Sequence, residues 1–116
     1  MEKFFAWSDC DGHPENVFSR DALLDNVMLY WLPDAGASSA RIYWESFRNR
    51  PVHQVSVPTG CSIFPKELTQ LPRHWIERRF TDLRYWNELD RGGHFASLER
   101  PDDFVAELRA FFRLVR

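Results

Sequence analysis

The sequence predicts an α/β fold, and three observations support this. Apolar residues recur at helical spacing in segments that begin near Ser19 and Pro101. Two strand-like runs, at 55–64 and 83–89, flank a helical segment. This strand–helix–strand order implies a right-handed crossover between parallel strands. Because a parallel pair normally lies inside a larger, covered sheet, we expect one end of an α/β domain with an incomplete sheet.

The N-terminal residues predict a short amphipathic segment, a loop and then a helix. The amphipathic segment is at 4–7, and a polar loop follows at 8–14. Ser19 is suited to cap the helix, with Asp21 in the first turn, where the helix dipole favours negative charge. The apolar residues at helical spacing are Leu23, Leu24, Val27, Met28 and Trp31.

The next segment predicts a helix end and a second helix. Pro33 and Gly36 are expected to end the first helix, because proline lacks the N–H and glycine favours turns. Ser38 or Ser39 is expected to cap the second. The apolar positions of that helix are Ile42, Tyr43 and Phe47.

A change of period at Pro51 begins the strand region. The first strand has an irregular middle, so regular pairing is predicted only after Pro58. Pro72 suits the first position of the crossover helix. The second strand leads into a glycine–histidine loop, which opens a short helix. Pro101 and two acidic residues then begin the final helix, whose apolar positions are Phe104, Val105, Leu108, Phe111, Phe112 and Val115.

Composition excludes several classes of function. The net charge of −2 and the lack of a basic stripe argue against nucleic acid as a partner. The apolar runs are too short to span a membrane, and no signal-peptide pattern opens the chain. Cys10 and Cys61 are far apart in sequence and form no disulfide framework. We therefore expect a reducing, cytoplasmic location and no membrane partner.

Two polar side chains follow the two predicted strands. Glu67 comes after the first strand, and His94 comes after the second, behind Gly92 and Gly93. Parallel strands end at the same edge of a sheet, about 4.8 Å apart, so we expect these side chains to meet. A carboxylate beside an imidazole orients the ring and stabilises its protonated form. The two residues together predict an acid–base pair.

Each of these residues also has a simpler interpretation. His94 alone could be a turn residue, Glu67 a solvated carboxylate near a helix start, and Tyr43 a core residue. The loop that holds Asp9, Cys10, Asp11 and His13 contains ligand-type residues, but their spacing fits neither a calcium nor a zinc site. We interpret this loop as a polar turn and expect no metal.

Several separate motifs resemble those of a known family. They are LDNVMLYW at 24–31, SSARIY at 38–43, FPKE at 64–67 and DRGGHFA at 90–96. Together, in this order, they resemble the epoxide hydrolases of the α/β-hydrolase superfamily, in particular the microsomal-type enzymes and their soluble bacterial relatives. The resemblance runs over nearly the whole chain.

The resemblance implies a mechanism and a set of roles. These enzymes open a small apolar epoxide with an aspartate nucleophile, which forms an alkyl-enzyme ester that water then hydrolyses to the diol. His94 matches the general base that activates the water, and Glu67 matches the acid that orients it. Tyr43 matches the second lid tyrosine, which donates to the epoxide oxygen. No cofactor and no metal is implied.

The sequence departs from the family pattern in its nucleophile. The family's aspartate sits on a glycine-flanked turn between strand and helix, and no glycine of this chain flanks such a turn. The H-G-x-P oxyanion motif is also missing, since no glycine separates His13 and Pro14. We therefore expect a C-terminal fragment, from a truncated gene or a longer reading frame, that is inactive alone. Residues 1–50 would be the end of the helical lid, and 51–116 the last strands and helices of the core.

A second hypothesis belongs to another class of function. The chain has ten Phe and five Trp, and aromatic residues are enriched at interfaces. The chain could thus be a non-catalytic module that docks a partner chain or an apolar ligand on an aromatic face. Under the first hypothesis, the hydrolase fragment, an unpaired strand edge favours self-association.

Overall fold

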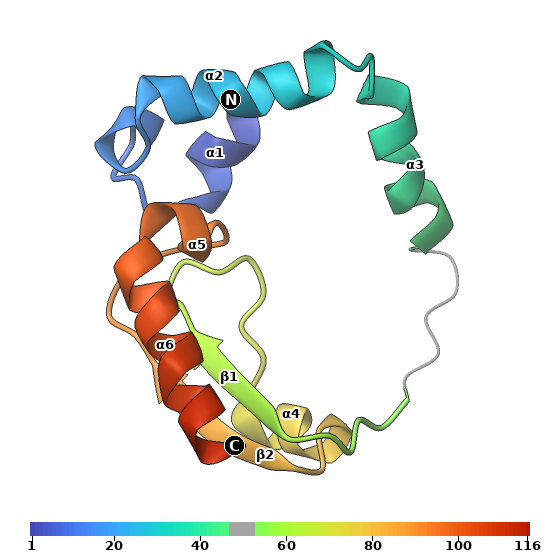
Figure 1. The fold of residues 1–116 in the computed structure, drawn as a ribbon, viewed down its shortest axis with the longest axis vertical. Coiled ribbons are helices and arrows are strands. Elements are labelled where there is room, and N and C mark those ends of the chain that lie inside the picture. Colours follow the sequence, from blue (N-terminus) through green and yellow to red (C-terminus); the bar gives the residue numbers. More distant parts are fainter. Residues whose placement is uncertain (47–52) are drawn as a thin grey trace.

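A computed structural model of the chain describes residues 1–46 and 53–116. Figure 1 shows their elements around an open centre, with α1 to α3 along the top and right and the strands and α4 at the bottom. The elements, in chain order, are α1 (Glu2–Trp7), η1 (Pro14–Asn16), α2 (Arg20–Trp31), α3 (Gly36–Ser46), β1 (Thr59–Ile63), α4 (Arg73–Arg79), β2 (Leu83–Glu88), α5 (Ala96–Glu99) and α6 (Pro101–Leu114).

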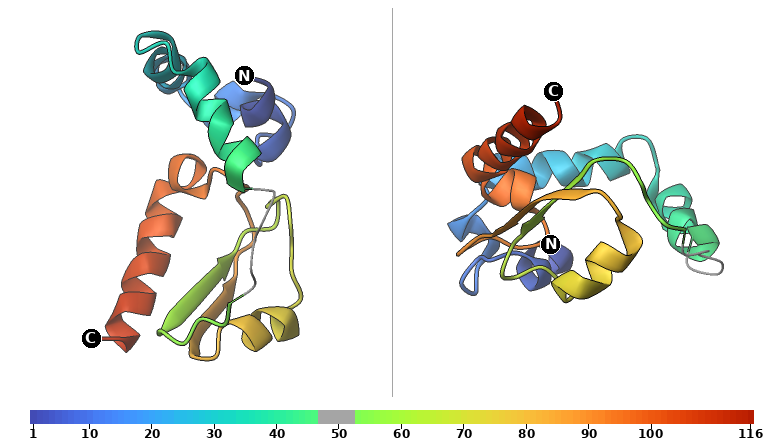
Figure 2. Two further views of the ribbon diagram at one scale, coloured as in Figure 1. Left: turned by 90° about the vertical axis from the view of Figure 1, so that its right-hand side faces the viewer. Right: turned by 90° about the horizontal axis from the view of Figure 1, so that it is seen from below.

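The two strands pair in parallel, as predicted. Gly60 pairs with Tyr85 and Ile63 with Glu88, after an irregularity between Thr59 and Gly60. Regular pairing thus begins only after the proline, as expected from the missing N–H. Figure 2 shows α6 on one face of the pair and α4 on the other. Within the described ranges the sheet has two strands, which agrees with the expected incomplete sheet.

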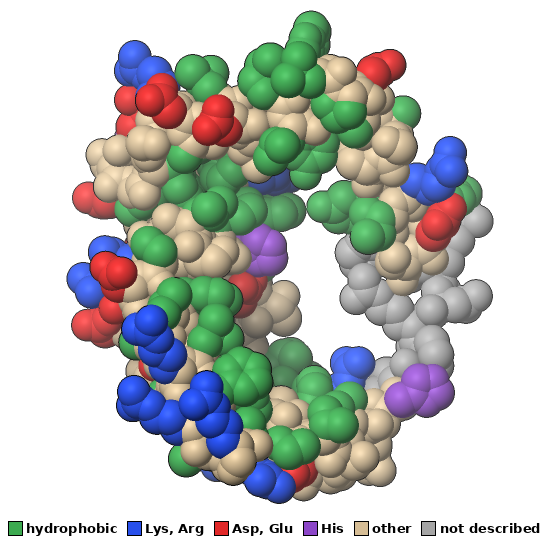
Figure 3. Space-filling model, viewed as in Figure 1, with side chains coloured by type: hydrophobic (Ala, Val, Ile, Leu, Met, Phe, Trp, Pro, Cys, Tyr) green, Lys and Arg blue, Asp and Glu red, His purple; other side chains and the backbone are tan. Residues whose placement is uncertain are grey.

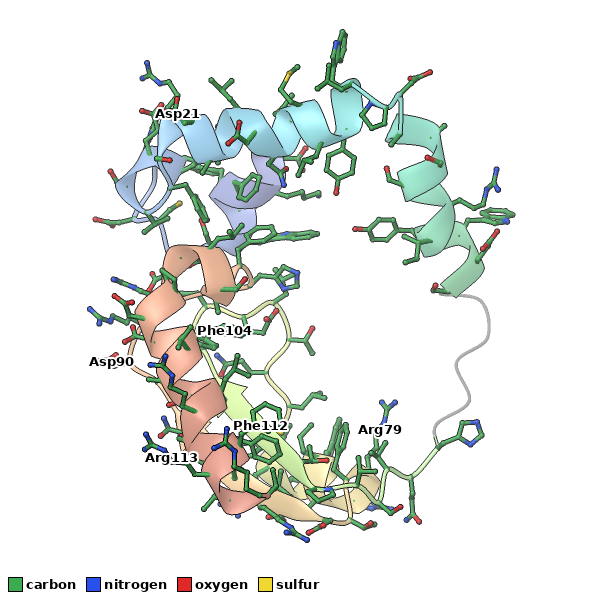
Figure 4. All side chains as sticks on the ribbon, viewed as in Figure 1. Asp21, Arg79, Asp90, Phe104, Phe112 and Arg113 are labelled. Carbon is green, nitrogen blue, oxygen red and sulfur yellow. The ribbon has the colours of Figure 1, made fainter. Side chains whose placement is uncertain are left out.

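The Glu107 carboxylate of α6 forms hydrogen bonds with side chains of both strands. Glu107 accepts hydrogen bonds from Ser62 Oγ at 2.7 Å, Tyr85 Oη at 3.0 Å and Asn87 Nδ2 at 2.9 Å. A half-buried anion is stabilised by such a set of donors. The final helix begins at Pro101 as predicted, and Figure 4 shows its residue Phe104 next to the strands.

The N-terminal caps of α2 and α3 can be compared with the caps that the sequence predicts. Ser19 caps α2 as predicted, its Oγ accepting from Ala22 N at 3.1 Å, and Asp21 lies in the first turn (Figure 4). The predicted caps of the next helix are wrong. Helix α3 begins at Gly36, so Ser38 and Ser39 lie inside its first turn.

The reason for this difference lies in the turn before α3. Asp34 adopts a φ of +51°, and Ala35 N donates to Tyr30 O at 2.9 Å. This reversal closes α2 before Gly36, which is then available to begin a helix. Pro33 follows the end of α2, as predicted. Pro72 is the N-cap of α4 and not its first helical residue, and Phe47 lies outside the described residues.

The buried core of the described residues is small. Phe4, Phe18 and Leu23 form one cluster, which joins α1 to α2. By contrast, Trp31 is 77% exposed and Leu32 is 75% exposed at the end of α2. Figure 3 shows hydrophobic side chains gathered on the surface of α2 and α3. Large apolar patches on a monomer mark surfaces that another element normally covers.

Both cysteines are free thiols, and His53 and His74 are exposed, as expected. Across 1–46 and 53–116, the helices are too short or too polar to cross a bilayer.

We expect the stability of the chain to fall in alkaline solution. Burial and the hydrogen bond to the Glu107 carboxylate raise the pKa of Tyr85 above its usual value of about 10, and burial raises the pKa of the Cys61 thiol. A group whose pKa is higher in the folded state than in the unfolded state contributes its full stabilisation below the unfolded-state pKa. That contribution is lost as the pH rises through the folded-state pKa. Urea unfolding from pH 8 to about 11 measures the fall. Tyr85→Phe and Cys61→Ala should each remove a part of it, and a flat profile in the unsubstituted chain would contradict the expectation.

Candidate active site

The parallel pairing continues beyond the two strands and sets the candidate site. Lys66 N donates to Gly92 O at 3.0 Å, and Lys66 forms an isolated parallel bridge with Gly93. Glu67 and His94 are the next residue on each segment. The main chain therefore carries these two side chains to neighbouring positions at one edge of the sheet, as the strand order predicted.

The two side chains are in direct contact. His94 Nδ1 lies 2.8 Å from Glu67 Oε1, and each side chain is a little more than one third exposed. The same carboxylate oxygen accepts from Leu68 N at 2.7 Å, which holds it in place. When Nδ1 carries the ring proton it donates to Glu67, and Nε2 is then the nitrogen that accepts a proton from another molecule.

Two glycines allow the loop to approach its neighbours closely. Gly92 has a φ of +101°, and a Cβ there would lie 2.8 Å from the buried ring of Phe64. A Cβ on Gly93 would lie 2.7 Å from Trp7 O. Both contacts are closer than carbon side chains tolerate, so the loop that presents His94 depends on glycine at both positions.

The N-terminal segment packs against this loop. His94 N donates to Trp7 O at 2.9 Å, and Gly92 N donates to Asp9 Oδ2 at 2.9 Å. The rings of Trp7 and Phe95 each meet the imidazole edge-on, with centroids 5.2 Å apart. One side of the imidazole thus borders apolar rings, while Nδ1 faces the carboxylate.

Sequence reasoning missed two acidic residues of this site. The sequence predicts only a polar turn around Asp9 and assigns no role to Glu99. Glu99 is buried, with 6% of its surface exposed, and accepts from three backbone N–H groups. Glu99 lies in the first turn of the four-residue helix α5, where the sequence alone suggests only a favourable charge for the helix dipole. No spacing in the sequence signals its contact with the backbone of Asp9, 90 positions away.

Tyr43 lies on a separate element. It belongs to α3 and is 59% exposed. Figure 1 shows α3 across the open centre from the loop between β2 and α5. The structure thus joins Glu67 to His94 and leaves Tyr43 apart from them.

Comparisons with known proteins place this arrangement in a family. A scan against models of protein families gives no match. A protein of Stigmatella aurantiaca that carries a provisional epoxide hydrolase name is 51% identical over 99% of this chain, which spans 26% of that protein. Epoxide hydrolase 1 of Sus scrofa is 34% identical over 99% of this chain and 28% of its own length. The chain belongs to the epoxide hydrolase family.

Solved structures of this family match the fold. The crystal structure of juvenile hormone epoxide hydrolase from the silkworm Bombyx mori aligns with a TM-score of 0.81 at 30% identity, over 99% of this chain and 33% of that one. An epoxide hydrolase variant from Aspergillus niger aligns with a TM-score of 0.79 at 32% identity, over 97% of this chain and 28% of that one. The fold is therefore a part of the α/β-hydrolase fold, and the chain spans about a quarter to a third of the relatives that it matches.

Proposed function

We propose that this chain is the C-terminal part of an epoxide hydrolase that converts small apolar epoxides to vicinal diols through an alkyl-enzyme ester. The observation that carries the proposal is the 2.8 Å contact between His94 and Glu67 where the two parallel strands end. In open α/β sheets, catalytic groups gather at that edge. Residues 1–50 are the end of the helical lid, and 51–116 are the last strands and helices of the core.

His94 acts as the general base of the second step. Its Nε2 takes a proton from a water molecule, and the oxygen of that water attacks the ester carbonyl carbon. Glu67 holds the ring through Nδ1 and stabilises the imidazolium that forms. The ester C–O bond then breaks, the diol leaves with the proton, and the carboxylate of the nucleophile is restored.

Tyr43 is the lid group that donates a hydrogen bond to the epoxide oxygen in the first step. A phenol can stabilise the negative charge that develops on this oxygen as the ring opens. Because α3 lies across the open centre from the loop between β2 and α5 (Figure 1), the substrate would lie between α3 and that loop.

The aspartate nucleophile comes from a segment outside these 116 residues. The sequence has no glycine-flanked aspartate turn and no H-G-x-P motif. The chain alone is therefore inactive, and its exposed apolar residues on α2 are the surface that the rest of the enzyme covers. Trp31 and Leu29, at 77% and 71% exposed, are candidates for that contact.

Complementation tests this function. The purified chain is mixed with a separately produced N-terminal segment of the Stigmatella relative, and diol formation from styrene oxide is measured. We expect diol from the mixture and none from either piece alone. Diol formation by the chain alone would contradict the missing nucleophile, and a stable but inactive complex would contradict the proposed function.

The exposed apolar surface also favours a second candidate, a non-catalytic docking module. Leu29, Trp31 and Leu32 are each more than 70% exposed. This second function would be supported if the chain is soluble alone, does not bind the complementary segment and binds a different partner tightly.

A further inference from the structure

We propose that Glu99 is a positioning residue that holds the loop of the general base, an inference that rests on the proposed function of His94. Four consecutive backbone N–H groups, from Gly92 to Phe95, each donate to an acceptor. Glu99 receives two of them, one on each side of His94. Its Oε2 accepts from Gly93 N and its Oε1 from Phe95 N, both at 2.9 Å.

A third hydrogen bond joins the N-terminal segment to the same carboxylate. Asp9 N donates to Glu99 Oε2 at 2.9 Å, while the Asp9 side chain accepts from Gly92 N. The carboxylate thus binds the loop of His94 and the segment packed against it at once. An ionised carboxylate suits this site, because it accepts through both oxygens and carries no donor.

The exposure of His94 explains why such a support matters. Its side chain is 38% exposed, so surrounding atoms do not enclose the ring. Catalytic groups must be held within about 0.5 Å of their working geometry. Here the peptide groups on both sides of His94 are fixed by one buried anion, which keeps Nδ1 within reach of Glu67.

The chemistry of glutamine makes Glu99→Gln a sharp test. Whichever way the carboxamide turns, its NH₂ group faces at least one backbone N–H, and two donors repel each other. Glu107→Gln is the matched control. Glu107 also accepts three hydrogen bonds, but two come from hydroxyl groups, which can reverse and accept from the amide.

The experiment uses the ¹⁵N-labelled 116-residue chain at about pH 8, above the unperturbed pKa of an imidazole and below the range of the expected alkaline loss of stability. In Glu99→Gln we expect amide exchange of Gly93 and Phe95 to rise about tenfold or more. We also expect the His94 ring nitrogens to shift from the tautomer with Nδ1–H toward the Nε2–H form. Glu107→Gln should change neither signal.

Unchanged His94 ring signals and amide exchange in a folded Glu99→Gln chain would overturn the proposal. If that variant fails to fold, Glu99→Asp replaces it, because its anion is one methylene too short to reach both flanks of His94, and the same two signals decide. Neither signal depends on turnover. A failed complementation with the expected signals therefore refutes the proposed function and leaves the positioning role standing, and active complementation with unchanged signals does the reverse.

Discussion

The His94→Gln chain, combined with the complementary segment, is expected to open the epoxide and then stall as the ester. In the proposed mechanism, the first step needs the aspartate of the other segment, whereas the second step needs a base that activates water. Loss of a general base slows proton transfer by about 10²–10⁴-fold. The measurements are the rate of diol formation and the intact mass of the complementary segment, which should increase by one substrate molecule.

A second histidine supplies the control for this result. His74 is exposed on α4 and contacts the ring of Trp75, away from the candidate site. His74→Gln should leave the rate unchanged and trap no ester. If the His94→Gln complex forms diol as fast as the unsubstituted one, His94 is not the base.

Gly93→Ala is expected to destabilise the chain by about 1–3 kcal/mol, the usual effect of forcing an extra carbon into a packed site. The new Cβ would lie 2.7 Å from Trp7 O and 3.0 Å from both Asp9 N and Ser8 Cα. All three are backbone atoms, so the N-terminal segment must move away from the His94 loop. Urea unfolding followed by circular dichroism measures the change.

Gly36→Ala is the matched control for this substitution. Gly36 begins α3, and nothing lies within 4 Å of a Cβ placed there. Alanine at a compatible helical position stabilises a protein by about 0.4–1 kcal/mol. Equal unfolding midpoints for the two variants would show that the close packing around Gly93 does not contribute to stability.

The sequence predicted correctly those helix and strand boundaries that depend on a few neighbouring residues. The cap at Ser19 depends on its own hydroxyl and the next turn, and the start of β1 depends on the missing N–H of Pro58. The prediction for α3 was wrong because Asp34 adopts a positive φ, which is uncommon outside glycine although aspartate tolerates it, and so reverses the chain before Gly36. Nothing in the apolar spacing signals that reversal.

The contacts of the candidate site were likewise only partly predictable from the sequence. The meeting of Glu67 and His94 was predictable, because parallel strands end at one edge and the two residues follow those ends. The contacts of Asp9 and Glu99 were not predictable, because Asp9 binds the backbone of a residue 83 positions away. Such contacts depend on how distant segments pack, which the spacing of one sequence does not record.

The position of these contacts along the chain has a consequence for its synthesis. Trp7 and Asp9 leave the ribosome early, whereas the loop residues 92–95 and Glu99, which bind them, leave it 83 to 90 residues later. The imidazole therefore becomes ordered only after the strands and the crossover helix have been made. The loop of His94 is therefore ordered late in synthesis, and the carbonyl of Trp7 and the carboxylate of Asp9 gain these loop partners only then.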